Sequence, residues 1–536
     1  MRVRPACPRS RSLLLVGLVI AFLPSIAAGQ TADDVYRFST RFSAVGLRAS
    51  GMSGAGGVGG WADPSALYTN PAGLGYYQAS EVSGSLSGLL SRDESTYQIF
   101  TDGPASQSTG DNVTARLGHL TGVYNVDTEQ GSLVFALGFN RTSAFDRELT
   151  YTGRNSASSI TDTFLPSGDE FEISEEDGTT TIDVIPIVPF VAFQAGATEF
   201  FDSRFQDGQY PFLQAVAPGR SIRQDGTVTR GGSMNELSFA GALEVAPNVM
   251  VGGSASLSYG TYAFENELTE IDLDGEDAYS VVAGDGLLED FQSMLFRERF
   301  TSDLTGFNLR LGLSANTVEH LRVGFTVETP TWYSIDETFT DAFIRTEFGN
   351  GTLTYGDDSG EDAARGAFDY RLQTPWRLST GVSYTRAPFL ISADVEFVDW
   401  SQTSLDADAT AFDVANENLE EYDYVVNWRG GVEYRSEDGF SLRGGIAYRP
   451  GARGFDFTLA DGEETDRSRL FLSAGAGLPL SEHLSVNAAW MQERSEDQFA
   501  PYSSVTPPGE SAAIDVPVVD EDIVRNQIRV GLRYSF

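Results

Sequence analysis

The sequence contains few residues whose types and spacing could carry out chemistry. Its three histidines stand far apart, with His119 on a predicted strand and His320 and His483 at predicted short turns. This placement does not gather them into a metal site or a catalytic triad. The motifs G-x-S-x-G and H-E-x-x-H, typical of serine hydrolases and zinc peptidases, do not occur. We therefore expect no enzyme, no catalytic residue and no cofactor.

Two acidic segments are the next candidates, because carboxylates bind divalent cations. Asp272–Asp277 resembles part of a calcium loop, but it lacks the D-x-D-x-D-G spacing and the distal glutamate. Asp357, Asp358, Glu361 and Asp362 form a second cluster, typical of a solvated loop tip. We predict solvated loops and no metal site, with calcium binding by these loops as the alternative.

A glycine-rich stretch could in principle bind a phosphate. Gly54, Gly56 and Gly59 satisfy the G-x-G-x-x-G spacing of dinucleotide-binding proteins. That motif binds a pyrophosphate only when it follows a strand and opens a helix. Here no strand pattern precedes it, and Pro64 and Pro71 interrupt the segment after it. We predict a compact segment with close backbone packing.

The charge of the chain limits its partners. The formal net charge is −40, and all 36 basic residues are arginine. Proteins that bind nucleic acid need a basic surface to neutralise phosphates, so nucleic acid is excluded as a partner. We interpret the acidity as a heavily solvated surface.

Residues 1–29 are typical of a secretory signal peptide. Arginines precede the apolar run Leu13–Leu23, and Ala27–Gly29 offers small residues for cleavage. We expect the mature chain to begin near Gln30. It then has no cysteine, because Cys7 lies in the leader, and disulfides and cysteine sites are excluded.

Alternating segments recur from Glu81 to the end of the chain. In Asn526–Phe536 one face is apolar and the other polar, as in a strand with one buried and one solvated side. About fourteen such segments occur, joined by short and long connections in turn, and their polar faces carry charges. This pattern predicts an all-β fold, a transmembrane antiparallel β-barrel of about 14 strands formed by residues 79–536. The charges expected in its lumen are Arg310, Arg322, Glu328, Arg377, Asp394, Glu396, Arg429, Glu433, Arg443 and Arg469.

Two of the predicted long loops carry apolar residues that a solvated loop does not need. The loop Ala144–Asn235 contains the apolar stretch Ile185–Phe201. In the loop Phe264–Ser302, apolar residues at i, i+1, i+4, i+7 and i+8 predict an amphipathic helix over Leu287–Leu295. Such loops pack on each other or capture an apolar ligand, and the two roles are compatible. The candidate ligand-binding residues are Phe190, Phe193, Leu287, Leu288, Phe291, Met294 and Leu295.

Four features then point to one family. Ala66–Leu74 reads ALYTNPAGL, Leu372–Arg377 reads LQTPWR, Val398–Ser401 reads VDWS, and the chain ends on Phe536. Together they resemble the NPA motif and the strand motifs of the FadL-like outer-membrane transporters of long-chain fatty acids and other hydrophobic compounds. The resemblance implies a bacterial outer-membrane location and a fourteen-strand barrel.

The same resemblance implies a hatch, residues 30–78, that plugs the lumen. It implies capture of a fatty acid or hydrocarbon by the outer loops, movement of the hatch, and lateral release at a kinked third strand. Gly138 and Asn140 are the candidates for the kink, because glycine inside a strand often marks a bend. Implied partners are the ligand, outer-membrane lipid and lipopolysaccharide, and the barrel assembly machinery that reads Phe536. The residues assigned to the hatch are Asn70, Pro71, Ala72 and Gly73.

Two other functions remain as alternatives at this point. A secretion-associated or structural barrel could use the same shape without moving a solute, because fold does not fix function. An outer-membrane lipase would need a serine and a histidine near the outer rim. No histidine occurs in the predicted long loops.

Overall fold

The computed structural model describes residues 28–41, 44–59, 61–98, 106–176, 179–275, 279–283, 286–356, 366–407, 412–420, 422–452, 466–508 and 512–536. Most of the predicted signal peptide lies outside the described residues. So do the cluster at Asp357–Asp362 and the last two residues of Asp272–Asp277.

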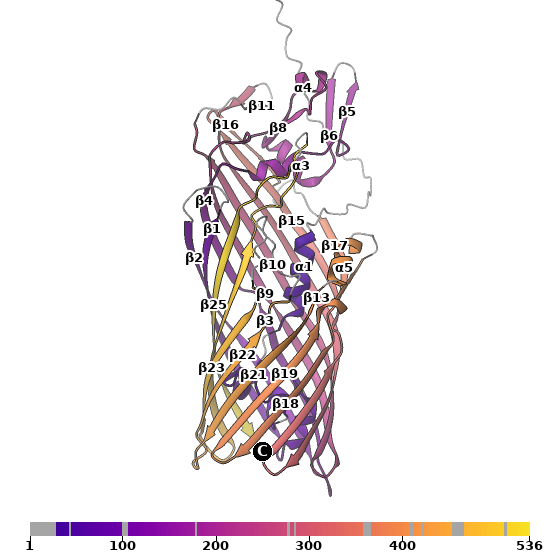
Figure 1. Cartoon of the computed structure of the whole chain (residues 1–536), viewed down its shortest axis with the longest axis vertical. Helices are drawn as coiled ribbons and strands as arrows, with labels where there is room; N and C mark the ends of the chain where they lie inside the picture. The colour runs from indigo at the N-terminus through magenta and orange to yellow at the C-terminus, as the bar shows by residue number, and fades with distance from the viewer. Residues whose placement is uncertain are drawn as a thin grey trace, which may run out of the picture.

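Long antiparallel strands close into a tall barrel (Figure 1). Nineteen strand segments of the described chain form one sheet, and where segments lie in line they make 14 staves. The ring closes where β1 (Glu81–Gln98) pairs with β25 (Val518–Ser535), from Glu81 opposite Ser535 to Gln98 opposite Val518. The predicted antiparallel barrel of about 14 strands is confirmed.

Four staves consist of two segments in line. They are β3 (Leu133–Ala144) with β4 (Arg147–Asn155), β14 (Leu321–Glu328) with β15 (Trp332–Phe348), β18 (Arg377–Arg386) with β17 (Gly366–Gln373), and β19 (Phe389–Asp399) with β20 (Ser404–Asp406). The remaining staves are β2 (Ser106–Val126), β9 (Ile222–Ala246), β10 (Val249–Asp272), β13 (Phe291–Val318), β21 (Tyr424–Arg435), β22 (Ser441–Arg449), β23 (Arg469–Pro479) and β24 (Leu484–Phe499).

Smaller elements decorate the barrel. Above it lie the hairpins β5–β6 (Phe171–Glu176, Thr179–Val184), β7–β8 (Thr198–Phe200, Phe212–Gln214) and β11–β12 (Ser280–Ala283, Gly286–Glu289), while β16 (Gly351–Tyr355) pairs with β15. The helices are α1 (Ala28–Ser39), α2 (Leu47–Ser50), η1 (Pro64–Leu67), η2 (Pro71–Tyr76), η3 (Ile160–Phe164), α3 (Ile187–Gln194), α4 (Asp202–Gln206), η4 (Trp400–Gln402) and α5 (Asp413–Glu420). No helix among the described residues is both long enough and apolar enough to span a membrane.

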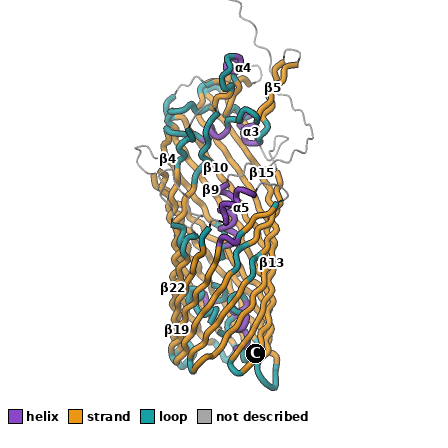
Figure 2. Tube along the Cα trace, turned by 45° about the vertical axis from the view of Figure 1, so that its right-hand side comes forward, coloured by secondary structure: helices purple, strands orange, loops and turns teal. Residues whose placement is uncertain are grey.

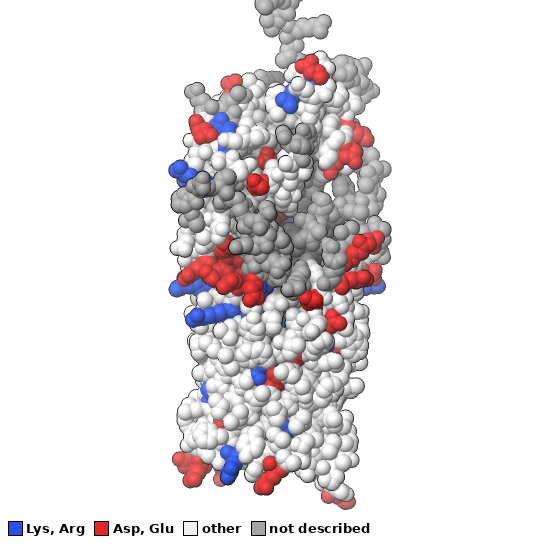
Figure 3. Space-filling model, viewed as in Figure 1, with Lys and Arg blue, Asp and Glu red and all other residues white. Residues whose placement is uncertain are grey.

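Figure 3 shows a nearly uncharged belt over the lower part of the visible face of the barrel, with charges gathered at its lower rim and above it. Neighbouring residues of a strand point to opposite faces, which creates the belt and a polar lumen together. On β13, Leu311 is 68% exposed, whereas the adjacent Arg310 is 1% exposed. Asp394, Arg429 and Glu433 are likewise buried inside, as the polar-lumen prediction requires.

The barrel wall is high on one side and low on the other (Figure 1). β9, β10 and β13 have 25, 24 and 28 residues, whereas β21, β22 and β23 have 12, 9 and 11. The expected long loops 144–235 and 264–302 are therefore partly wrong, because the strands on either side continue into them. Above the belt these strands still pair with each other, and their inward positions are buried.

The expected amphipathic helix over Leu287–Leu295 is also wrong. Leu287 and Leu288 belong to the β11–β12 hairpin, and β13 begins at Phe291. The β13–β15 register shifts between Phe291 and Ser293, which marks a β-bulge. A bulge adds one residue to a strand, so Phe291 and Met294 are both buried although three positions separate them. In the sequence, this three-residue spacing of apolar residues resembles the periodicity of an amphipathic helix.

The N-terminal segment, of which residues 34–41, 44–59 and 61–77 are described, lies inside the barrel, where Figure 2 shows helical turns and loops enclosed by the strands. Its residues Met52, Ala55, Leu67, Ala72 and Leu74 are at most 1% exposed. Val35 and Phe38 belong to the larger apolar core in the upper part of the barrel, whereas Leu67 and Leu74 belong to a separate cluster. The N-terminal segment therefore fills the lumen of the barrel.

Candidate functional site

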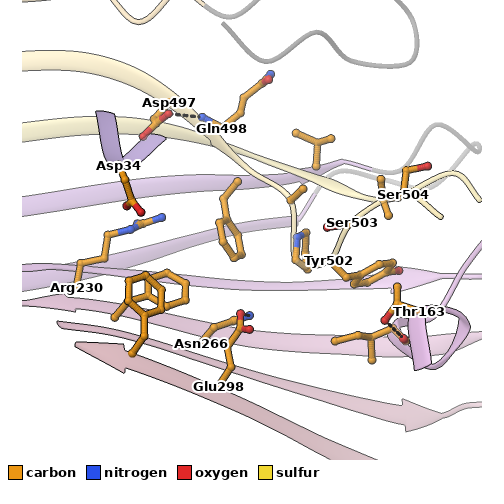
Figure 4. A pocket seen from close by; sticks show the side chains of 18 of the residues that line it. Asp34, Thr163, Arg230, Asn266, Glu298, Asp497, Gln498, Tyr502, Ser503 and Ser504 are labelled. Atoms are coloured by element: carbon orange, nitrogen blue, oxygen red, sulfur yellow. Dashed lines mark hydrogen bonds between the residues drawn. The ribbon is translucent and has the colours of Figure 1, made fainter. Parts of the chain in front are cut away.

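A cavity of about 1190 Å³ lies above the level of the belt. It is bounded by the barrel wall, by α1 of the N-terminal segment, by η3 and the start of α3, and by the connection from β24 to β25. Figure 4 shows part of it from close by. Pockets for small molecules have volumes of about 300–1,000 Å³. The cavity thus has room for a long molecule.

Aromatic rings form one side of the cavity. Phe264 of β10 and Phe300 of β13 stack with their ring centres 5.0 Å apart, and Tyr262 meets Phe145 edge to face at 5.2 Å. Tyr262 and Phe264 point the same way because they are two positions apart on one strand. Such rings bury a large apolar area with a defined shape. The rings on this side are Phe145, Phe164, Tyr262, Phe264, Phe296 and Phe300.

Ion pairs form the side near β23, β24 and β25. Arg467 pairs with Asp497 at 2.9 Å, and Arg469 pairs with Glu493 at 3.3 Å. Arg525 approaches the same Glu493 at 3.8 Å. The cavity is therefore amphipathic, with an aromatic side and a charged side whose charges largely compensate each other.

Arg230 differs from the other arginines of the cavity. Its guanidinium lies 6.0 Å from the ring centre of Phe264 and 5.7 Å from that of Phe499. Its Nη1 is buried and, within the described chain, Arg230 has no hydrogen bond or ion pair. Figure 4 shows Arg230 and Asp34 extending toward each other from β9 and α1. The cavity arginines that do form ion pairs are Arg37, Arg41, Arg147, Arg467, Arg469 and Arg525.

A buried carboxylate anchors the roof of the cavity. Glu270 of β10 accepts hydrogen bonds from the Ile160 amide at 2.9 Å, from Gln224 Nε2 at 2.6 Å and from the Ser159 hydroxyl. Ser159 also caps η3, which carries Ile160 and Phe164 into the cavity. Burial raises the pKa of the Glu270 carboxyl to about 7, although its hydrogen bonds act in the opposite direction.

A second buried carboxylate faces the cavity directly. Glu298 of β13 accepts a hydrogen bond from Asn266 Nδ2 at 3.1 Å, and both residues line the cavity. Burial raises the pKa of Glu298. The aromatic side therefore holds one carboxyl group that gains protons more readily than an exposed glutamate.

The N-terminal segment forms the floor and is tied to the lumen wall by polar contacts. Arg48 makes two hydrogen bonds of 2.8 Å to the carboxylate of Glu433. Asp394 accepts a hydrogen bond from the Gly56 amide at 2.7 Å, and Arg529 donates to the carbonyl of Ala44 at 2.8 Å. Such charge-assisted hydrogen bonds fix the orientation of the segment.

The predicted hatch residues Asn70, Pro71, Ala72 and Gly73 lie in this floor. The Asn70 side chain accepts from the Ala72 amide at 3.1 Å and donates to the carbonyl of Val58 at 2.7 Å. The backbone of the segment touches the wall, because a Cβ added to Gly252 would lie 2.4 Å from the carbonyl carbon of Pro71. The glycine-rich sequence packs as closely, because a Cβ added to Gly59 would lie 2.4 Å from the hydroxyl oxygen of Ser383.

The third stave leaves the wall above Asn140. The β2–β3 ladder of the described residues ends at His119 opposite Asn140, and the β3–β9 register shifts between Arg141 and Ser143. β4 then crosses the inner side of β1, where Tyr151 stacks on Tyr97 with ring centres 6.1 Å apart. Above this point β1–β2 and β4–β9 overlap in a seam.

The structure places the two kink candidates at the base of this seam. Gly138 packs on the floor, since an added Cβ would lie 2.6 Å from a Leu67 methyl. Asn140 is buried, and its Oδ1 has no hydrogen-bond partner among the described residues. The change of direction comes just after them, at residues 141–146.

The seven candidate capture residues do not line the cavity. Phe193, Phe291 and Met294 are buried among the upper elements, and Phe190 meets the Tyr355 ring edge to face at 5.7 Å. On α3 it is Val188 and Pro189 that line the cavity instead. The sequence showed that this helix is apolar, but α3 is apolar on all sides, so no periodicity marks the side facing the ligand space.

The histidines remain apart, as expected. His119 is buried, and its Nδ1 is 2.6 Å from the Ser85 hydroxyl. His320 and His483 lie at turns on the rim where the C-terminus also lies. Within the described ranges, no group of three histidine or acidic side chains is placed to hold a metal ion.

Sequence comparison identifies one family. Residues 214–500, more than half of the chain, match the family described as Outer membrane protein transport protein (OMPP1/FadL/TodX). No curated protein sequence matches the chain significantly.

Comparison with solved structures gives the same fold. A FadL homologue from Pseudomonas aeruginosa has 13% sequence identity and a TM-score of 0.50, and the match covers 92% of this chain and 98% of that one. The P. putida toluene transporter TodX has 12% identity and a TM-score of 0.49, with 92% and 99% of the two chains covered.

Proposed function

The chain belongs to the family of outer membrane transport proteins described as OMPP1/FadL/TodX, and we propose on this basis that it carries hydrophobic small molecules across the bacterial outer membrane. The observation that carries the proposal is the cavity of about 1190 Å³ with an aromatic side, held inside the barrel above a packed floor. Burying apolar surface there contributes about 25 cal/mol per Å². A water-filled pore offers an apolar solute no such gain.

The cavity favours an apolar molecule with one anionic end, such as a long-chain fatty acid, over a plain hydrocarbon. Arg230 supplies a cation that makes no hydrogen bond or ion pair within the described chain, beside the Phe264 and Phe499 rings. A carboxylate at Arg230 would gain charge-assisted hydrogen bonds, while its chain lies along Phe296 and Phe300. A hydrocarbon would leave the guanidinium unpaired.

The ligand route that fits these contacts is lateral. Beneath the floor lie buried charges, among them the ion pair of Arg310 and Glu236 at 2.6 Å. Desolvation of these charges by an apolar solute would cost free energy, so a downward path is unfavourable. Ser143 and Phe145 line the cavity and lie next to the seam, which supports an exit there instead. We propose that α1 and the upper part of the N-terminal segment move to admit the ligand to this seam.

The outer surface agrees with a barrel in an outer membrane. We propose that the belt contacts lipid, and that the charged zone above it meets the lipopolysaccharide head groups. Phe536 ends the chain with its side chain 62% exposed next to the belt residue Tyr534. This position suits a residue that the barrel assembly machinery reads.

The function is tested with two phenylalanines of one strand. Phe296 lines the cavity, whereas Phe291 is buried in the same core but does not line it. Each alanine variant creates a similar loss of packing. If the cavity carries the ligand, Phe296→Ala lowers uptake of a labelled long-chain fatty acid by cells well below that of Phe291→Ala, at equal barrel content in the membrane.

Equal uptake by the two variants and the wild type would remove the cavity from the mechanism. It would then favour the alternative function, a secretion-associated or structural barrel. A protein partner that copurifies with the barrel, together with a cavity that binds no fatty acid in detergent, would support that alternative.

A further inference from the structure

A second, smaller chamber lies beneath the cavity, beside the N-terminal segment. Its volume is about 60 Å³, and Arg41 lines both spaces. A water molecule needs roughly 10–15 Å³ of such free volume. The chamber therefore has room for one small ion together with water. Its lining is mainly polar and includes Tyr68, Thr69 and Asn140.

Positive charge predominates in the chamber lining. Three of its arginines have carboxylate partners: Arg41 and Arg310 share Glu328, Arg310 also pairs with Glu236, and Arg377 pairs with Glu396 at 3.4 Å. Within the described residues the other two arginines have no ion pair. The charged residues of the lining are Arg41, Glu236, Arg310, Glu328, Arg377, Glu396, Arg429 and Arg449.

Arg429 is the decisive residue. It is 8% exposed, and within the described chain it has neither a hydrogen bond nor an ion pair, with Nε fully buried. Its neighbour across the β19–β21 ladder is Asp394, which would be its natural partner. The Asp394 carboxylate instead accepts the amide of Gly56 from the N-terminal segment. The other oxygen of Asp394 has no hydrogen-bond partner among the described residues, and Arg429, which forms no ion pair with it, lines the chamber.

A second donor faces the same space. The hydroxyl of Thr326 is buried, lines the chamber and has no partner among the described residues. Unpaired buried donors are costly, and an unpaired buried cation is costlier still. An anion that accepts from Arg429 and Thr326 would remove both costs.

We propose that this chamber binds a monovalent anion, held by Arg429 and Thr326. The chemistry required is one negative charge on a group small enough for the chamber. A halide from the medium meets this requirement. The anion would complete the charge balance of the lumen below the floor. The proposal stands on the chamber alone and does not depend on what the upper cavity carries.

The test uses bromide, which scatters anomalously and replaces chloride. Crystals of the wild-type protein in detergent are soaked in bromide, and the anomalous difference density is inspected between Arg429 and Thr326. We expect a peak there. In a second arm, crystals grown with a long-chain fatty acid are soaked in bromide in the same way. The peak should persist there, because the site takes its anion from the medium.

Water alone in the wild-type chamber, with no bromide peak at saturating soak, overturns the proposal. The variant Arg429→Met should abolish the peak. Its control is Arg435→Met on the same strand, which removes an arginine that is paired with Glu433 and half exposed at the rim. The wild-type result decides the matter even if Arg429→Met fails to fold.

Discussion

Arg116 of β2 and Asp146 between β3 and β4 form an ion pair of 2.6 Å across the seam, above the point where the ladder joining their staves ends. Arg116 also donates to the carbonyl of Gly232 on β9 at 3.3 Å. One side chain thus connects the two overlapping edges beside the cavity. If the ligand leaves through the seam, the contacts of Arg116 with Asp146 and Gly232 must break.

A reversible cross-link across the seam tests lateral release. The predicted mature chain has no cysteine, so Arg116→Cys with Asp146→Cys can be joined by a short cleavable thiol reagent. We expect fatty acid uptake to fall to background when the link is made and to recover when it is reduced. The single-cysteine proteins, treated alike, serve as controls. Uptake that persists through a complete cross-link would exclude this exit.

Replacing Arg230 tests which end of the ligand the cavity recognises. Arg230→Met should weaken fatty acid binding by roughly ten- to a hundredfold, because hydrogen bonds to charged groups contribute about 1.5–3 kcal/mol. Binding of the matching alkane should change little. The control is Arg223→Met, an exposed arginine of the same strand that is paired with Asp225. Calorimetry in detergent measures both ligands, and an equal loss for acid and alkane would contradict the assignment.

The sequence predicted the staves because a strand alternates its side chains wherever one face meets lipid. Leu311 beside Arg310 is an example, and the pattern needs no knowledge of the neighbouring strands. Above the belt the outer face meets water, and the inward face of a strand mixes apolar residues such as Phe264 with polar ones such as Asn266. That alternation is weaker, so these stretches resemble loops.

The site was less predictable for a related reason. Arg230 is distinctive only because the six other cavity arginines form ion pairs. Five of them pair with carboxylates on other elements, and these pairings depend on the closed barrel. Phe190 and Phe193 are more apolar than Pro189, yet they pack away from the cavity. Hydrophobicity shows that a loop is buried, but it does not show on which side the ligand lies.

The floor should be sensitive to one methyl group at Gly56. Its φ is +84°, and an added Cβ would lie 1.9 Å from the Trp61 ring. A left-handed backbone alone costs an alanine about 1–2 kcal/mol. Gly56→Ala should therefore loosen the segment and increase the ion conductance of single barrels in a planar bilayer. Gly168→Ala, where an added Cβ meets nothing within 4 Å, should leave conductance unchanged.

Glu270 should make stability depend on pH. Its pKa is raised from 4.5 to about 7, so between these values the folded protein holds a proton that the unfolded chain has lost. Its stabilising effect is then full below about pH 4.5 and is lost as the pH rises through 7. The wild type should lose more stability than Glu270→Gln between pH 5 and pH 8, by about 3 kcal/mol at most.

Thermal unfolding of both proteins at the two pH values measures this difference. Glu289→Gln, which changes an exposed glutamate of the upper region, should behave as the wild type. Parallel curves for the wild type and Glu270→Gln would assign the titration to another buried carboxyl, such as Glu298.

The pairing of β1 with β25 also sets an order of events for biogenesis. The segment that fills the lumen is made first by the ribosome, while the stave that seals the ring around it is made last. Arg529 of that final stave donates a hydrogen bond to the carbonyl of Ala44, so the closing stave contacts the N-terminal segment directly. We therefore expect the N-terminal segment to enter the lumen before β25 pairs with β1 and closes the barrel.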